Sequence, residues 1–229
     1  MPGPADNAAI ATDKSALLPG QPASFANVTS FDKGINGIML DVSGGLPLTA
    51  LAGLAGNLGF KVGAAGDPSG WANGPRPSQF TILPDAGVDG SDRIILVWAD
   101  GAIRNTWLRV TVPALPQGGF NAPEAFYFGN LVGETGDGGG ASGWRVSALD
   151  LGQVKRDLNK AAGITSPTDV NRDGRVNALD LGILKRALNQ SLAPPLVPAP
   201  AAAAQALPPA ALFSDGDGKS ARLLDELLA

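Results

Sequence analysis

The chain contains no cysteine and no histidine among its 229 residues. Without cysteine it can form neither a disulfide nor a zinc thiolate site. Without histidine it lacks the usual general base of Ser-His-Asp and Cys-His catalysis. Glutamate is also scarce, with only Glu124, Glu134 and Glu226. The possibility that a pair of aspartates cleaves glycosides stays open, but nothing in the sequence supports it. We therefore expect a non-catalytic protein without an organic cofactor.

A basic excess and long apolar runs are absent as well. The 17 basic and 21 acidic residues give a net charge of −4, whereas nucleic acids and anionic membranes attract basic patches. No apolar run approaches the roughly 18 residues that cross a membrane. We therefore expect the chain to bind neither nucleic acid nor a membrane. The N-terminus shows no secretory signal. Because the repeats near the C-terminus, described below, are typical of secreted proteins, we interpret the chain as the C-terminal part of a longer extracellular protein.

Short apolar and alternating segments indicate β-strands between residues 22 and 113. Residues 94–98 are apolar on both faces, as in a central strand, while 58–62 and 108–112 alternate apolar with other side chains. Strands at this spacing predict an all-β sandwich over 22–113. Residues 1–21 are then a flexible lead-in and 114–133 a connector. Because consecutive aromatics cannot all face one way, we expect part of 126–128 to pack between the two halves of the chain.

Two features of the predicted sandwich suggest ligand binding. Trp71 follows a turn and is the tryptophan that we single out for stacking on a sugar. Asp85, Asp89 and Asp92 cluster around a glycine-containing turn and offer ligands for an ion, but a solvated turn is the preferred interpretation because aspartate is common in turns.

Residues 169–180, with the sequence DVNRDGRVNALD, have the spacing of an EF-hand-like calcium loop. Side-chain oxygens occupy loop positions one, three, five, nine and twelve, glycine occupies position six, and a backbone carbonyl serves at position seven. An Asx-rich turn that caps a helix is the alternative, but so many matching positions disfavour it. The predicted calcium ligands are Asp169, Asn171, Asp173, the carbonyl of Arg175, Asn177 and Asp180.

Residues 145–159 and 175–189 are identical at eleven of fifteen positions, which indicates a duplicated loop–helix unit. The two helices are short, so we expect their apolar stripes to face each other. The first copy lacks side-chain oxygens at the expected loop positions before Asp150. A loop widened by about five residues would supply them at little entropic cost, although a metal-free loop stays open. The ligands of this second calcium site would be Glu134, Asp137, Ser147 and Asp150.

The duplication, the calcium loop without an incoming helix and the Lys-Arg pair in each helix resemble type I dockerin repeats over about residues 130–190. The resemblance implies a small all-α module, at 134–190, with two calcium-binding repeats. Such modules stand at the C-terminal end of secreted proteins and dock onto cohesin domains in polysaccharide-degrading assemblies. The upstream region is similar to β-domains that precede dockerins in large secreted bacterial proteins.

Loop positions ten and eleven depart from the family pattern. Cohesin-binding dockerins tend to carry small hydroxyl residues there, whereas both repeats of this chain have Ala-Leu. The leucines could contact a more apolar partner or pack against the chain's own sandwich. The candidate partner-binding residues are Ala148, Leu149, Lys155, Arg156, Ala178, Leu179, Lys185 and Arg186.

Residues 191–229 read as an Ala/Pro-rich linker followed by a short amphipathic helix. Three functions therefore stay open. The first is an extracellular calcium-binding module for docking or scaffolding. The second is a carbohydrate-binding accessory part of a glycoside hydrolase. The third is an intramolecular clamp stapled by calcium, which contact of Leu149 or Leu179 with the sandwich would favour, whereas exposure of both would favour a partner.

Overall fold

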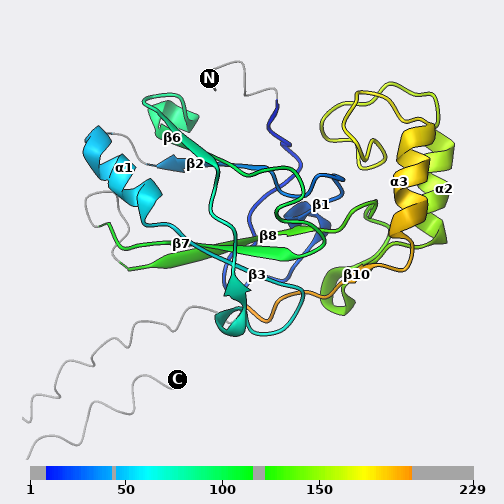
Figure 1. Ribbon diagram of the computed structural model, residues 1–229, viewed down its shortest axis with the longest axis horizontal. Helices are drawn as coiled ribbons and strands as arrows, with labels where there is room; N and C mark the ends of the chain where they lie inside the picture. The colour runs from blue at the N-terminus through cyan, green and yellow to red at the C-terminus, as the bar shows by residue number, and fades with distance from the viewer. Residues whose placement is uncertain (1–8, 43–44, 116–121, 198–229) are drawn as a thin grey trace, which may run out of the picture. The chain divides into compact units, whose positions relative to one another are not determined.

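The computed structural model describes residues 9–42, 45–115 and 122–197. They form a sheet-rich N-terminal region followed by two helices (Figure 1) and belong to one compact unit. The predicted C-terminal helix, most of the Ala/Pro linker and the start of the lead-in lie outside the described residues. Within the described ranges, no helix is long and apolar enough to cross a membrane.

The larger sheet has five strands in the order β1-β8-β7-β3-β4. Its centre is β7 (Trp107–Val112), which pairs antiparallel with β3 (Gly59–Gly63) and β8 (Glu124–Asn130). At the edges, β1 (Val28–Thr29) runs parallel to β8, and β4 (Ala72–Asn73) runs antiparallel to β3. The alternation predicted for 58–62 and 108–112 is confirmed in β3 and β7.

The smaller sheet has three antiparallel strands in the order β2-β6-β5. They are β2 (Gly37–Val42), β6 (Asp92–Val97) and β5 (Gln79–Leu83), and α1 (Leu48–Gly56) follows β2. The continuous apolar run predicted a central strand, and β6 takes that place. Short 3-10 turns also occur at Phe25–Asn27, Pro68–Gly70, Val88–Gly90 and Gly140–Ser142.

The two sheets and α1 enclose an apolar core, as expected of a sandwich (Figure 1). Ile94 and Leu96 of β6 and Leu108 and Val110 of β7 are almost fully buried in it. Because these are alternate residues of their strands, the other residues of each strand point to the outer faces.

The predicted connector at 114–133 is wrong for residues 124–130, because this segment forms strand β8. Phe126 and Phe128 pack against the core between the sheets, whereas Tyr127 is buried on the opposite face of the larger sheet. The expectation that the aromatics split between two directions is therefore confirmed. Pro123 flanks the strand and does not interrupt it. The surrounding proline and glycine residues favoured the prediction of a connector, although the side chains of β8 alternate between the two faces of the sheet.

A second apolar core joins the outer face of the larger sheet to the C-terminal helices. Val28 and Trp107 of the sheet share this core with Trp144, Val154 and Leu184 of the helical part. The rings of Trp107 and Trp144 lie 6.0 Å apart between centroids, and the Trp107 indole N–H donates to the carbonyl of Ala193 at 2.8 Å. Sheet and helices are thus packed directly against each other.

The two repeats have the same local structure. Each helix, α2 (Ala148–Asp157) and α3 (Ala178–Ala187), starts at a capping box. A short antiparallel pair, β9 (Trp144–Arg145) with β10 (Ser191–Leu192), links the start of the first repeat to the residues after the second. Val154 of α2 and Leu184 of α3 are buried at matching positions, which confirms that the two apolar stripes form one core.

We expect Gly133→Ala to lower the free energy of unfolding by about 2–3 kcal/mol. The alanine would be strained by the left-handed backbone, and its Cβ would also press against a neighbouring side chain. Gly133 has φ +83°, and a Cβ there would lie 3.3 Å from Cγ of Leu184. Gly101→Ala is the matched control, with φ +78° and open space around the added Cβ, and should cost about 1 kcal/mol. Urea unfolding of both variants in calcium measures the difference, and equal losses would contradict the tight contact.

Candidate functional site

Asp169 and Asp180 close the second-repeat loop from its two ends, and both are buried. Asp169 accepts hydrogen bonds from the N–H groups of Asp173 at 3.2 Å and Gly174 at 3.0 Å. Asp180 accepts from the N–H groups of Val170 and Asn177, each at 2.8 Å. Burial raises the pKa of the Asp169 carboxyl, and the negative charges of Asp180 and Asp173 add to this effect.

The remaining predicted ligands of this loop gather around Asp173. One carboxylate oxygen of Asp173 accepts from the side-chain amides of Asn171 and Asn177, each at 3.0 Å, and the other accepts from the N–H of Arg175 at 3.0 Å. Hydrogen bonds from Asn171 and Asn177 lower the pKa of the Asp173 carboxyl. The loop therefore brings Asn171 and Asn177 to Asp173, whereas the carboxylates of Asp169, Asp173 and Asp180 do not form a close cluster of three.

Glu134, Asp137 and Asp150 of the first-repeat loop form a tight carboxylate cluster. Each offers an oxygen, and the three oxygens lie within 4.8 Å of one another. The hydroxyl of Ser147 donates to Asp137 at 3.4 Å, so all four residues predicted for this site come together. Among the described residues, this is the only group of three or more acidic side chains that meets so closely.

Matching hydrogen bonds show how the two loops correspond. Asp150 accepts from the N–H of Thr135 and the N–H of Ser147, each at 2.7 Å, just as Asp180 accepts from Val170 and Asn177. Thr135 thus corresponds to Val170, which makes Glu134 the counterpart of Asp169. The first loop spans seventeen residues against twelve, in agreement with the predicted widening, and the additional residues include the glycine-rich turn at 138–143.

One oxygen of Glu134 is buried and accepts no hydrogen bond. The other accepts from the N–H of Gly136 at 2.9 Å. Burial, reinforced by the negative charges of Asp150 and Asp137, raises the pKa of Glu134 to about 7. A buried carboxylate oxygen without a donor, facing two further carboxylates, is unfavourable unless a cation or proton offsets the charge. The first loop has the donor set and electrostatics of a hard-cation site.

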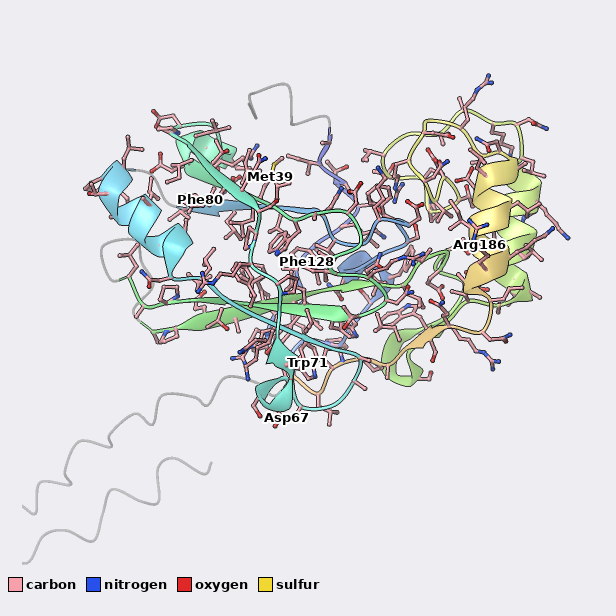
Figure 2. The ribbon with its side chains drawn as sticks, in the orientation of Figure 1. Met39, Asp67, Trp71, Phe80, Phe128 and Arg186 are labelled. Atoms are coloured by element: carbon pink, nitrogen blue, oxygen red, sulfur yellow. The ribbon has the colours of Figure 1, made fainter. Side chains whose placement is uncertain are left out.

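The predicted partner-binding residues all lie on an exposed face of the two helices. Leu149 and Leu179 are 67% and 63% exposed, and neither belongs to an apolar core. Ala148, Ala178 and both Lys-Arg pairs are exposed as well; Figure 2 marks one of them, Arg186, on α3. We call these eight residues the docking face. Val154 and Leu184 of the same helices belong instead to the core shared with the sheet.

Contacts that the sequence did not predict hold the second-repeat loop against the sheet-rich region. The N–H of Asp32 donates to the carbonyl of Val170 at 2.9 Å, and the hydroxyl of Ser30 donates to the carbonyl of Pro167 at 3.2 Å. Gly133, just before the first-repeat loop, donates its N–H to the carbonyl of Ser30 at 3.2 Å. No spacing signal in the sequence marks Ser30 or Asp32, because these contacts join segments distant in the chain.

The structure overturns the stacking role of Trp71. Its side chain is only 8% exposed, its indole N–H donates to the carbonyl of Ala65 at 2.8 Å, and its ring meets Tyr127 edge-on. Figure 2 places it beside the turn that carries Asp67. Gly63 makes room for the ring, because a Cβ there would lie 2.4 Å from it. Trp71 is a core residue with no open face for a sugar.

The acidic turn at residues 85–92 agrees with the preferred interpretation. Asp92 is buried and accepts from the N–H of Asp85 at 3.2 Å, while Asp85 and Asp89 have left-handed backbones. The three carboxylates do not form a close cluster of the kind found in the first-repeat loop. The segment is therefore a turn closed by its own hydrogen bonds.

Comparison with protein families matches two overlapping segments, residues 144–189 and 167–201, to the dockerin type I domain. No curated protein and no solved structure matches the chain. The matched segments contain both helices and the whole second-repeat loop, but they begin after the widened part of the first loop. Type I dockerins are calcium-binding, non-catalytic modules that bind cohesins. Residues 144–201 of this chain therefore belong to the type I dockerin family and follow a sheet-rich N-terminal region.

Proposed function

We propose that this chain is an extracellular, non-catalytic docking protein that binds calcium in both dockerin loops and presents its docking face to a cohesin-like partner. The observation that carries the proposal is the exposure of Leu149 and Leu179 at equivalent positions of the two repeats. A single exposed apolar side chain is ordinary on a monomer, whereas a contiguous apolar surface rimmed by polar residues marks an interaction site. Leu149 and Leu179 stand at matching positions of two helices that contact each other. The family's usual setting favours a role in polysaccharide-degrading systems.

The second-repeat loop is the firmer of the two proposed calcium sites. Its ligands would be Asp169, Asp173 and Asp180, the amide oxygens of Asn171 and Asn177, and the carbonyl of Arg175. Calcium takes six to eight oxygen ligands, which this set provides. The ion would also offset the repulsion between the three carboxylates and so stabilise the loop that sets the start of α3.

The first-repeat loop would hold a second ion through Glu134, Asp137, Asp150 and the hydroxyl of Ser147. Support comes from the buried oxygen of Glu134 that accepts no hydrogen bond and from the closeness of the three carboxylates. Calcium satisfies both features at once, because it binds carboxylate oxygens without needing a hydrogen-bond donor.

The packing of the helices on the larger sheet favours an additional function, the calcium-stapled clamp. The core shared by Trp107, Trp144 and Leu184 and the hydrogen bonds from Ser30 and Asp32 join the two regions through the side opposite the docking face. Calcium would then stabilise the sheet-rich region together with the helices, while the docking face stays available to a partner.

We expect saturating calcium to raise the melting temperature by about 5–10 °C over chelator, because an ion that binds only the folded state stabilises it. Asp169→Asn combined with Asp180→Asn should remove at least half of this shift. Asp89→Asn, in the acidic turn, is the matched control and should leave the shift intact. Calorimetric melting of the full chain measures all three. Equal melting temperatures in calcium and chelator would contradict the metal sites.

Titration calorimetry should report two calcium ions per chain. Glu134→Gln should reduce this to one, because it removes the buried charge from the first loop while keeping the shape of the side chain. Glu124→Gln changes an exposed glutamate outside both loops and should retain two ions. A stoichiometry of one in the unmodified chain would show that the first loop is metal-free and leave the second site untouched.

We expect Leu149→Glu combined with Leu179→Glu to weaken binding to a type I cohesin domain at least about tenfold, because buried unpaired charge is costly at an interface. Leu48→Glu is the matched control, since Leu48 is 59% exposed on α1, away from the docking face. Calorimetry in calcium and in chelator measures the affinities. Failure of the unmodified chain to bind would leave the clamp as its function, and unchanged affinity of the double variant would exclude the proposed face.

A further inference from the structure

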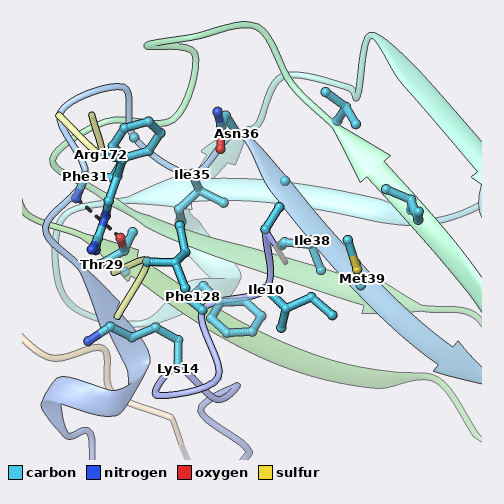
Figure 3. A pocket seen from close by; sticks show the side chains of 18 of the residues that line it. Ile10, Lys14, Thr29, Phe31, Ile35, Asn36, Ile38, Met39, Phe128 and Arg172 are labelled. Carbon is cyan, nitrogen blue, oxygen red and sulfur yellow. Dashed lines mark hydrogen bonds between the residues drawn. The ribbon is translucent and has the colours of Figure 1, made fainter. Parts of the chain in front are cut away.

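A cavity of about 690 Å³ lies on the sheet-rich region, away from the docking face. It is bounded by the free edge of β2, by β1, by residues 9–14 and by the second-repeat loop (Figure 3). Because β2 pairs only with β6 among the described strands, none of those strands fills the space beyond its other edge. The volume is within the roughly 300–1,000 Å³ of small-molecule sites.

The walls of the cavity are largely aliphatic. Ile10 comes from the N-terminal segment, Ile38 and Met39 from β2, and Phe128 from β8 (Figure 3). Ile95 of β6 also lines the cavity. Isoleucine and methionine outnumber the aromatic side chains, so the surface suits a flexible alkyl chain better than a flat ring. Such a surface gains free energy when an apolar ligand displaces water from it.

Two cationic side chains, Lys14 and Arg172, also line this cavity. The Lys14 ammonium lies 3.1 Å from the Asp13 carboxylate, 3.2 Å from the carbonyl oxygen of Phe25 and 3.8 Å from the centroid of the Phe25 ring. The Arg172 guanidinium donates to the carbonyl of Ser166. Both side chains are largely buried, and the positive charge of Arg172 adds to burial in lowering the pKa of Lys14.

Asp13 pairs with Lys14, and the negative charges of Asp169 and Asp13 also act on Arg172. Because both cations line the same cavity, an anion bound there would add charge-assisted hydrogen bonds to those that Lys14 and Arg172 already make. Arginine and lysine both bind carboxylates through charge-assisted hydrogen bonds. The cavity thus combines a long apolar wall with a cationic wall, the complement of an amphiphilic anion.

We propose that this cavity binds an aliphatic carboxylate, with its alkyl chain among Ile10, Ile38 and Met39 and its carboxylate between Lys14 and Arg172. The site is independent of the proposed docking function, because none of its lining residues belongs to the docking face. One wall of it comes from the second-repeat loop, so experiments belong in saturating calcium, where that loop is held in place.

Titration calorimetry of the full chain with octanoate tests the proposal. We expect one octanoate per chain and at least about tenfold weaker binding of octylammonium, which has the same chain length and the opposite charge. 3-Phenylpropionate should bind more weakly than octanoate. Absence of octanoate binding, or equal binding of octylammonium, would overturn the proposal, and tighter binding of 3-phenylpropionate would overturn its aliphatic part.

Lys14→Gln and Arg172→Gln should each weaken octanoate binding about tenfold, because each removes one charge-assisted contact. Arg76→Gln, which removes an exposed cation outside the cavity, should leave the affinity unchanged. The calcium titration is repeated on Arg172→Gln, so that damage to the neighbouring loop is recognised separately. Unchanged affinity in Lys14→Gln, which lies outside the loop, would overturn the assigned carboxylate position.

Discussion

The buried carboxylates Asp150 and Asp180 determine how each repeat is built. Each accepts the N–H of the second residue of its loop and, with its other oxygen, the N–H of the residue that caps its helix. One side chain therefore fixes the loop ends, the helix start and the direction of the helix axis. Because a buried carboxylate is costly to desolvate, an arrangement with several of them per loop favours a bound cation, which is the physical reason for placing calcium there.

The same two loops are the points at which the helices meet the sheet-rich region. Val170 follows the first ligand position of the second loop, and its carbonyl receives the N–H of Asp32. Gly133 precedes the corresponding position of the first loop and fits closely against Leu184. Disturbing a loop would therefore disturb the core around Trp107. The two repeats are packed against the sheet-rich region and are not joined to it by a flexible linker. Rigid attachment fixes the direction in which the docking face points relative to the sheets.

Local patterns in the sequence predicted the elements whose structure depends on residues close together in the chain. Ligand spacing located the second loop, and the repeat located both helices and the widened first loop. Strand β8 was hidden because its alternation is bracketed by proline and glycine. The burial of Trp71 depends on Gly63 and Tyr127, and the cavity gathers residues from Ile10 to Arg172, which only the tertiary fold brings together. No periodicity within a single segment encodes such long-range arrangements.

Leu149 and Leu179 are large apolar side chains that the folded chain leaves in contact with water. Each stands in the first turn of its helix, where the chain gains nothing from an apolar side chain that stays in water. A hydroxyl there would form hydrogen bonds with a polar partner, whereas leucine contributes only when a partner buries it. The neighbouring Lys-Arg pairs add positive charge to the rim of this surface. Under the proposed docking function, the complementary partner surface would have an apolar centre and an acidic border.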